Sequence, residues 1–327
     1  MLHIGGYTAG QGGAALGIVT ALRRPDGRLT LADVTPASDP SFLAAHPTLP
    51  VVYAVNELEA GTVTVLTADP ARSVLEPIAV VPSGGAAPCH VTVAADGSRL
   101  AVTNYSDGTV AVRDLDLQGR PGSASVLRHD GGGPVADRQE GPHAHMGLFH
   151  DGILYTVDLG ADRIHRYRGT VALDPVRLPA GSGPRHLTTD GHGYWYLTNE
   201  LDGTVAGFRG GSTGPWTEVS RVPASGSATQ NYPSHLILSR DGTHLYVANR
   251  GPDTLSAFTV HDGQLSPAGE WATDGEWPRH FAIVGDHVYV ANQRSHSVTL
   301  FGLPGGTGLP RPTGHVFTTP SPACILG

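Results

Sequence analysis

The sequence predicts an all-β fold, a seven-bladed β-propeller built from four-stranded antiparallel blades. The first observation is a repeat in which a proline opens a short apolar run, at Pro40, Pro88, Pro142, Pro184, Pro233, Pro278 and Pro322. Successive prolines are 48, 54, 42, 49, 45 and 44 residues apart, a period typical of propeller blades. The second observation is composition: 44 glycines and 26 prolines among 327 residues favour short strands joined by tight turns. We therefore expect a single domain over residues 1–327.

One repeat shows the strands most clearly. A first strand begins at Pro233, and the Asp241-Gly242 turn separates it from a second strand at residues 245–249. A third strand follows at residues 254–258, and a looser fourth strand comes after Asp262. The runs are β-branched or aromatic and are bounded by Asp and Gly, which is the pattern of strands joined by turns.

The same register recurs in the other complete repeats. Second strands are predicted to end in Asn or Asp 14 to 16 residues after the proline, at Asn56, Asn104, Asp158, Asn199, Asn249 and Asn292. Third strands are predicted to begin at Thr62, Thr109, Arg163, Thr204, Thr254 and Ser297.

The seventh repeat is split between the two ends of the chain. Residues 322–326 supply a first strand, residues 2–7 resemble a second, and residues 16–19 resemble a third. Joining the N- and C-terminal strands in one blade would close the ring and remove two open sheet edges.

The net charge and the composition limit the classes of molecule that the protein is expected to bind. The net charge is −8, and no cluster of arginines and aromatics suggests nucleic acid. The chain has no lysine, so any anionic ligand must be held by arginine, and Schiff-base chemistry is excluded. No apolar stretch has membrane-spanning length, residues 1–8 lack the pattern of a signal peptide, and two cysteines make no disulfide framework, so we expect a cytoplasmic protein.

Polar residues gather at one predicted face. The start of a first strand and the end of the antiparallel second strand lie together, and the residues at these positions are His90, His143 or His145, His186, His235 and His280, then Tyr105, Glu200, Arg250 and Gln293, with Arg185 and Arg279 beside the histidines. Any one histidine could simply bond a neighbouring blade. Arginines and a carboxylate at the same mouth have no packing role, so the set predicts a ligand site.

Two other chemistries are conceivable at this mouth, a metal site and a cysteine nucleophile. His143 and His145 lie on the same side of a strand and could bind zinc, but the remaining histidines lack ligand spacing, so no metal is expected. Cys89 has small apolar neighbours and reads as a packed, inert thiol. The glycine-rich segment 131–134, in the longest step between repeats, opens no helix and is interpreted as a rim over the mouth that leads to Arg138.

Several motifs together resemble the propeller-type lactonase family, which includes bacterial 6-phosphogluconolactonases and fungal carboxymuconate lactonizing enzymes. They are Arg138-Gln139-x-x-Pro142-His143-Ala144-His145, Asp158-Leu159-Gly160-Ala161-Asp162-Arg163, Gly183-Pro184-Arg185-His186-Leu187, Asn199-Glu200-Leu201, Ser239-Arg240-Asp241-Gly242, Leu245-Tyr246-Val247-Ala248-Asn249-Arg250-Gly251 and Trp277-Pro278-Arg279-His280-Phe281. The resemblance spans nearly the whole chain. It implies a propeller whose mouth makes or opens a lactone of a small acid, and it assigns the chemistry to His143 or His145, Arg185, Glu200 and Arg279.

The residues suit that reaction. Lactone hydrolysis needs a base for water, donors for the oxyanion and an acid for the departing alkoxide. A histidine and Glu200 would share the proton transfers, and Arg185 and Arg279 would hold a carboxylate, a phosphate or the oxyanion. No cofactor is expected, and the partner is a small lactone or carboxylate. His90, Tyr105, His186, His235, His280, Arg250, Gln293 and Arg138 are expected to bind substrate.

Two alternatives remain open at this stage. The same groups would serve a cycloisomerase or lyase that forms or opens a C–O bond in a muconate-like acid. A propeller can also act as a non-catalytic interaction platform, in which case Arg185, Glu200 and Arg279 would point apart and apolar side chains would fill the channel. The sequence leaves open the oligomeric state, the recognition of phosphate and which of His143 and His145 faces the channel.

Overall fold

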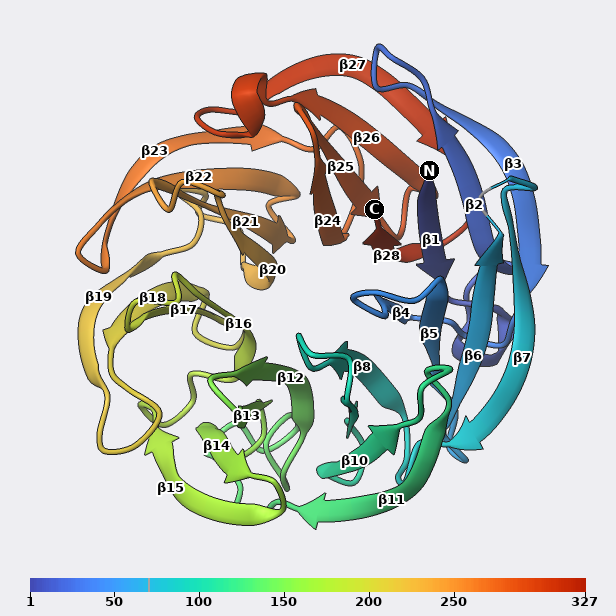
Figure 1. Ribbon diagram of the computed structural model, residues 1–327. Helices are drawn as coiled ribbons and strands as arrows, with labels where there is room; N and C mark the ends of the chain where they lie inside the picture. Colours follow the sequence, from blue (N-terminus) through green and yellow to red (C-terminus); the bar gives the residue numbers. More distant parts are fainter. Residues whose placement is uncertain (70) are drawn as a thin grey trace.

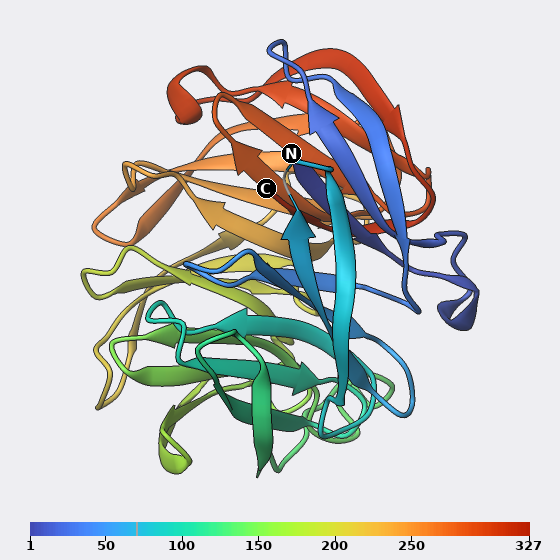
Figure 2. The ribbon, with the colours of Figure 1, turned by 45° about the vertical axis from the view of Figure 1, so that its right-hand side comes forward.

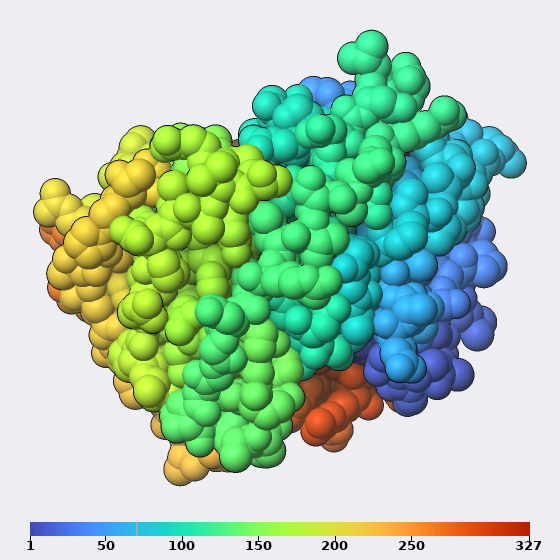
Figure 3. Space-filling view, turned by 90° about the horizontal axis from the view of Figure 1, so that it is seen from below, coloured from blue at the N-terminus to red at the C-terminus, as the bar shows by residue number. Residues whose placement is uncertain are grey.

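Seven four-stranded antiparallel sheets surround a central axis in the computed structural model, which describes residues 1–69 and 71–327 (Figure 1). Each sheet is one blade, with its first strand nearest the axis and its fourth at the rim. In the space-filling view the blades follow one another in chain order around the rim, from blue through cyan and green to yellow (Figure 3). The predicted all-β, seven-bladed architecture is confirmed.

Six blades are continuous in the chain. From the innermost strand outward they comprise β4 (Phe42–Ala45), β5 (Val51–Asn56), β6 (Thr62–Asp69) and β7 (Val74–Pro82); β8 (Pro88–Val93), β9 (Arg99–Asn104), β10 (Thr109–Leu115) and β11 (Pro121–Arg128); β12 (Ala144–His150), β13 (Ile153–Asp158), β14 (Arg163–Arg168) and β15 (Val171–Arg177); β16 (Pro184–Thr189), β17 (Tyr194–Asn199), β18 (Thr204–Arg209) and β19 (Thr217–Pro223); β20 (Tyr232–Leu238), β21 (His244–Arg250), β22 (Thr254–His261) and β23 (Gln264–Ala272); and β24 (Pro278–Val284), β25 (His287–Asn292), β26 (Ser297–Gly302) and β27 (Arg311–Thr318). All six third strands begin at the predicted residues.

The seventh blade joins the two ends of the chain. Its strands, from the axis outward, are β28 (Pro322–Leu326), β1 (Leu2–Gly6), β2 (Gly17–Arg23) and β3 (Leu29–Pro36). Gly5 pairs with Cys324 in the antiparallel ladder between β1 and β28, and the two termini lie side by side in both ribbon views (Figures 1 and 2). The predicted closure by terminal strands is confirmed. Short 3-10 turns at Ala9–Gln11 and Pro304–Gly306 are the helical elements of the described chain.

Apolar side chains fill the spaces between neighbouring blades. The second strands β5 and β13 are buried at every residue, and β25 is buried at all but its first, because each lies in the middle of a blade that is covered on both faces. Tyr155 of β13 and Trp195 of β17, whose ring centroids are 4.5 Å apart, belong to one such layer. In outer strands such as β7 most residues are exposed or half-buried, as expected at a rim.

Strand register brings the polar residues to one end of the blades. Pro184 at the start of β16 pairs with Asn199 at the end of β17, and Pro278 of β24 pairs with Asn292 of β25 in the same way. The innermost strands also contact one another around the whole ring. Residues next to these positions in different blades are therefore brought to a common mouth.

Deleting residues 322–327 should cost much of the stability of the fold. The deletion removes β28, exposes the edge of β1 and uncovers the contacts of Ile325, whose burial alone contributes about 1.5–3 kcal/mol. That loss and the lost ladder are large beside a total of about 5–15 kcal/mol. We expect a lower and broader thermal transition by circular dichroism. Deleting Gly327 alone is the control, and equal melting temperatures for the two proteins would contradict this role for β28.

Candidate active site

Glu200 lies at the centre of three guanidinium groups that come from separate parts of the chain. Arg138, in the segment between β11 and β12, donates from Nη2 to Oε1 over 2.7 Å, and Arg250 at the end of β21 donates from Nη2 to Oε2 over 2.6 Å. Arg185 of β16 brings Nε to 3.0 Å from Oε2. The Nε–H of Arg185 is not directed at this oxygen, so the contact is an ion pair without a hydrogen bond.

Charge pairing keeps this carboxylate ionised in a buried place. Burial raises the pKa of Glu200, but Arg250, Arg185 and Arg138 outweigh it and hold the pKa well below its usual range. Burial and the neighbouring Arg250 lower the pKa of Arg185 to about 9, so this guanidinium remains charged at neutral pH. Glu200 is therefore suited to orienting arginines, and its basicity is low.

Arg279 of β24 has a different environment. Its guanidinium carbon lies 4.9 Å from the centre of the Tyr7 ring, and Nη1 makes a long contact of 3.5 Å with Oε1 of Gln293. Within residues 1–69 and 71–327, no carboxylate lies within 4.0 Å of it. Burial alone would lower the pKa of Arg279, but Tyr7 and Glu57 outweigh it and raise the pKa. Among the described residues the one hydrogen-bonding contact of Arg279 is this long one to Gln293, so its other donors can serve an anionic ligand.

A second carboxyl group, Glu57, stands beside Arg279 and was missed in the sequence. The Tyr7 hydroxyl donates to Oε2 of Glu57 over 2.9 Å. Burial raises the pKa of Glu57, and Arg279 only partly offsets this effect. The mouth therefore contains two carboxyl groups whose pKa values are shifted in opposite directions, that of Glu200 downward by three arginines and that of Glu57 upward by burial.

The repeat contained a signal for Glu57 and also for Tyr7, which was not assigned to the site from the sequence. Glu57 directly follows Asn56 at the end of β5, as Glu200 follows Asn199 at the end of β17. Tyr7 follows the last residue of β1, which is the second strand of the split blade. Applying the position rule to every blade would have found them.

A small cavity lies between Arg185 and Arg279. Its volume is about 10 Å³, room for about one water molecule. The residues that line it are Tyr7, Ser41, Phe42, Cys89, His145, Arg185, His186, Arg279, His280 and Ala323. Arg185 from one side of the mouth and Arg279 from the other therefore face a common space.

The two histidines of the His-Ala-His segment point to different places. His145 lines the cavity, and its Nδ1 is buried without a hydrogen-bond partner among the described residues. Burial and Arg185 lower the pKa of His145 well below its usual range, so it is neutral. His143 instead donates from Nδ1 to the Tyr105 carbonyl over 2.8 Å, and its Nε2 lies 3.1 Å from Oε1 of Glu140. In the described part of the chain, His143 and His145 do not belong to any group of converging metal-ligand atoms, so the structure does not support a zinc site shared by these two imidazoles.

The remaining predicted histidines occupy the channel as a packed group. His186 and His235 approach with 2.8 Å between their Nδ1 atoms, and the His235 and His280 rings stack with centroids 4.0 Å apart. His90 lies against Phe42, with centroids 4.1 Å apart. Burial lowers the pKa of His90 and of His280 to about 3, so both are neutral at physiological pH. Of these four, His186 and His280 line the cavity, and His90 and His235 do not.

Tyr105 and Arg250, which are also predicted to bind substrate, lie beside the ion pairs of Glu200. The Tyr105 hydroxyl accepts from Nη2 of Arg138 over 3.3 Å, and its ring stacks on His143. Arg250 also donates from Nε to the Tyr232 carbonyl over 3.0 Å, which fixes its direction. Burial raises the pKa of the Cys89 thiol to about 12, which fits the predicted inert role.

The whole chain is similar to proteins of one known family. The model of the family described as lactonase, seven-bladed β-propeller, matches residues 1–327. A 6-phosphogluconolactonase of Formosa agariphila is 28% identical over 94% of this chain and 93% of its own, and that of Bacillus subtilis is 30% identical over 74% and 73%. The structure of the periplasmic gluconolactonase of Pseudomonas aeruginosa superposes with a TM-score of 0.91 at 30% identity, covering 99% of this chain and 98% of that one. No helix of the described residues is long and apolar enough to cross a membrane.

Proposed function

We propose that this chain, which belongs to the seven-bladed β-propeller lactonase family, hydrolyses a phosphorylated sugar-acid lactone at the channel mouth. Membership in this family makes it a lactone hydrolase, and relatives named 6-phosphogluconolactonase and gluconolactonase point to sugar-acid lactones as the substrate class. The observation that carries the finer proposal is the arrangement of four arginines, of which Arg279 has no carboxylate partner among the residues that the structure describes.

The charge at the mouth favours an anionic substrate. Arg138, Arg185, Arg250 and Arg279 supply four positive charges, and Glu200 supplies one negative charge. Glu57 adds a second negative charge only when it is ionised. The surplus suits a phosphate better than a neutral sugar lactone, and in a chain without lysine only guanidinium groups can hold it.

The arginines are suited to both binding and catalysis. Arg185 and Arg279 both line the cavity, which has room for about one water molecule, so a lactone at the mouth outside it would present its carbonyl to the two guanidinium groups. One of them can hold the acidic end of the substrate while the other donates to the oxygen that becomes negative as water attacks the carbonyl. Glu200 would act as a positioning residue, because it fixes the directions of Arg138 and Arg250 and is too weak a base to take a proton.

Glu57 is the stronger candidate for proton transfer. Its carboxyl group stands beside Arg279 and accepts a hydrogen bond from Tyr7, and its raised pKa makes its carboxylate a better base than that of Glu200. It would take a proton from the attacking water and return it to the departing ring oxygen. His145 is neutral and unpartnered, so it can accept a hydrogen bond from the same water.

Glu57→Gln should remove the acidic limb of the pH profile. A carboxylate acting as base must be ionised, so kcat/KM of the native enzyme falls as the pH is lowered through the pKa of Glu57, which burial places above the ordinary 4.5. The variant should lose about 10²–10⁴-fold in kcat and show a flat profile in that range. Glu59→Gln, two residues away and exposed, is the matched control. An unchanged acidic limb in Glu57→Gln would show that another group is the base.

Comparing lactones tests the function itself. Initial rates of acid release would be measured with 6-phosphogluconolactone and gluconolactone, corrected for spontaneous hydrolysis in the same buffer. We expect both to be opened, with kcat/KM at least about tenfold higher for the phosphorylated substrate, which corresponds to about 1.4 kcal/mol. Equal values would contradict phosphate recognition, and no rate above buffer for either would contradict lactone hydrolysis by this mouth.

The two alternatives, an interaction platform and a cycloisomerase, make different predictions for this site. The interaction platform predicts that Arg185, Glu200 and Arg279 point apart, whereas Arg185 and Glu200 lie 3.0 Å apart and Arg279 lines the same cavity as Arg185. It also predicts an apolar channel, whereas imidazoles occupy the channel. A muconate-like diene acid added to the substrate set would reveal cycloisomerase activity by loss of its absorbance, since that reaction uses the same arginines.

A further inference from the structure

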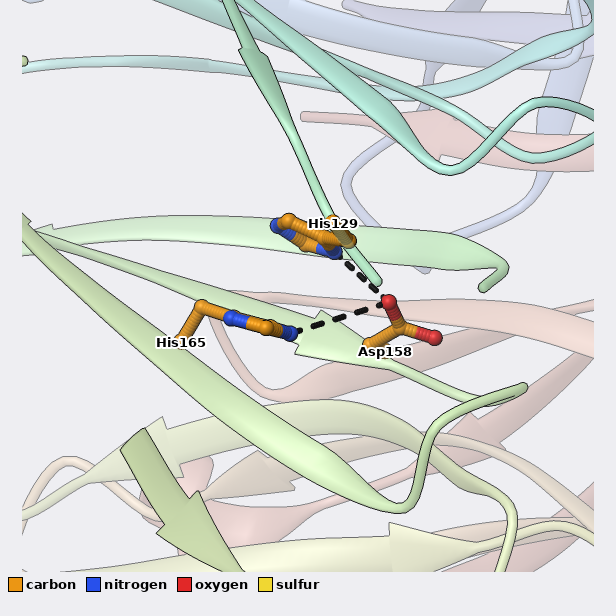
Figure 4. A group of neighbouring side chains, drawn as sticks. All are labelled: His129, Asp158 and His165. Carbon is orange, nitrogen blue, oxygen red and sulfur yellow. Dashed lines mark hydrogen bonds and ion pairs between the residues drawn. The ribbon is translucent and has the colours of Figure 1, made fainter. Parts of the chain in front are cut away.

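Apart from the arginines and histidines already described, two histidines and an aspartate converge in a buried cluster. His129 follows β11, Asp158 ends β13, and His165 lies in β14. Nδ1 of His129 is 2.6 Å and Nε2 of His165 is 3.8 Å from the same oxygen, Oδ2 of Asp158. Figure 4 shows both imidazoles directed at this oxygen. The three potential ligand atoms lie within 4.8 Å of one another, and this is the one such group of three or more among the described residues.

We propose that this cluster binds a divalent transition-metal cation of the Zn²⁺ type. Imidazole nitrogens and a carboxylate oxygen are ligands that such ions prefer. At ordinary zinc bond lengths, neighbouring ligand atoms of a tetrahedral site are about 3.4 Å apart. The two distances to Oδ2 bracket that value, and the two imidazole nitrogens lie within 4.8 Å of each other, so binding an ion requires shifts of the ligand atoms of about 1 Å. The His129 and His165 rings stack with centroids 3.8 Å apart and must tilt for both nitrogens to point at one ion.

Charge supports a cation at this place. The Asp158 side chain is completely buried, and no arginine among the described residues lies within 4.0 Å of it. A buried carboxylate requires a positive partner, and the neighbours are the imidazoles of His129 and His165. Nε2 of His165 is buried and has no hydrogen-bond partner in the described chain, so a lone pair is available inside the cluster.

Outer contacts hold the ligands in place, as in metal sites generally. Nε2 of His129 lies 3.0 Å from the Thr156 hydroxyl, which leaves Nδ1 for the cluster. Oδ1 of Asp158 accepts from the backbone N–H groups of His143 and Ala161 over 2.8 and 2.9 Å, which leaves Oδ2. An ion here would join the start of the segment that carries Arg138 to the blade formed by β12–β15, so its role would be structural.

Zinc binding by the purified chain tests this inference independently of lactone hydrolysis. The protein would be treated with a chelator, dialysed, exposed to Zn²⁺ alone and desalted, and bound zinc would be measured by mass spectrometry. We expect one zinc per chain and a melting temperature that rises with the zinc concentration. No retained zinc and an unchanged melting temperature would overturn the proposal.

Variants locate the ion. His165→Phe keeps an aromatic ring stacked on His129 but removes a ligand atom, so it should bind zinc at least about 100-fold more weakly. His261→Ala removes an exposed histidine beside Asp262 and should bind like the native chain. Loss of zinc in His261→Ala instead, or native affinity in His165→Phe, would overturn the assignment. If His165→Phe does not fold, X-ray absorption of the Co²⁺-loaded native chain decides: two imidazole ligands support the site, and a shell of oxygens alone overturns it.

Discussion

Replacing Glu200 by glutamine is expected to reduce kcat/KM at least about 100-fold and to destabilise the fold. The amide keeps the shape of the side chain but removes the one negative charge shared by Arg138, Arg185 and Arg250. Removing one partner of a buried ion pair typically costs about 3–5 kcal/mol, because the remaining charges stay buried and uncompensated. Loss of one correctly placed donor to an oxyanion costs about 10²–10³ in rate, and here several donors would shift together.

Activity and urea unfolding of the same variants separate the two effects. Glu200→Asp keeps the charge on a shorter side chain and should recover part of the stability and little of the activity, since the donors would be displaced. Glu218→Gln, which breaks a more exposed ion pair with Arg221 in the same blade, should change neither by much. More than a tenth of native activity in Glu200→Gln would show that the arginines do not depend on this carboxylate.

The second large effect is expected at Arg279. Arg279→Met keeps an unbranched side chain over the Tyr7 ring and removes a guanidinium that, within residues 1–69 and 71–327, has no carboxylate partner. We expect a loss of at least about 100-fold in kcat/KM for the phosphorylated lactone, with a smaller loss for the unphosphorylated one. The melting temperature should stay nearly constant, because no ion pair is broken.

A matched substitution distinguishes a specific contact from the general field of the mouth. Arg294 is exposed and lies with its guanidinium carbon 3.6 Å from the centre of the Trp277 ring, so Arg294→Met removes a similarly stacked cation from the same blade. It should reduce kcat/KM only slightly. Equal losses in Arg279→Met and Arg294→Met would mean that net charge alone governs binding and that Arg279 makes no direct contact.

Local sequence patterns were sufficient for the blades. Strand boundaries follow from turn residues next to short apolar runs, and the residues at which third strands begin, such as Thr62 and Thr254, are as predicted. The split blade was also predictable, because residues 2–7 and 322–326 each carry one part of the same repeat. These features depend on neighbours in the chain, so one sequence reveals them.

Pairing between distant residues was not predictable in the same way. Arg138 reaches Glu200 across 62 residues because the long segment after β11 turns over the mouth, and the repeat says nothing about that path. The direction of a side chain was also hidden: His145 turns into the cavity and His143 toward Glu140, although they are two residues apart. The cluster of His129, Asp158 and His165 was missed because only one of its members occupies a mouth position of the repeat.

The sequence by itself determined the seven blades, their closure and the set of positions that reach the mouth, because strand register follows from a local period. Only the tertiary structure decided which charges meet there. Glu200 holds three arginines while Arg279 keeps its donors free beside Glu57. The physical reason is that electrostatic and hydrogen-bond partners are set by distances of a few ångströms across different blades. Such distances depend on loop paths and side-chain rotamers that the repeat does not encode.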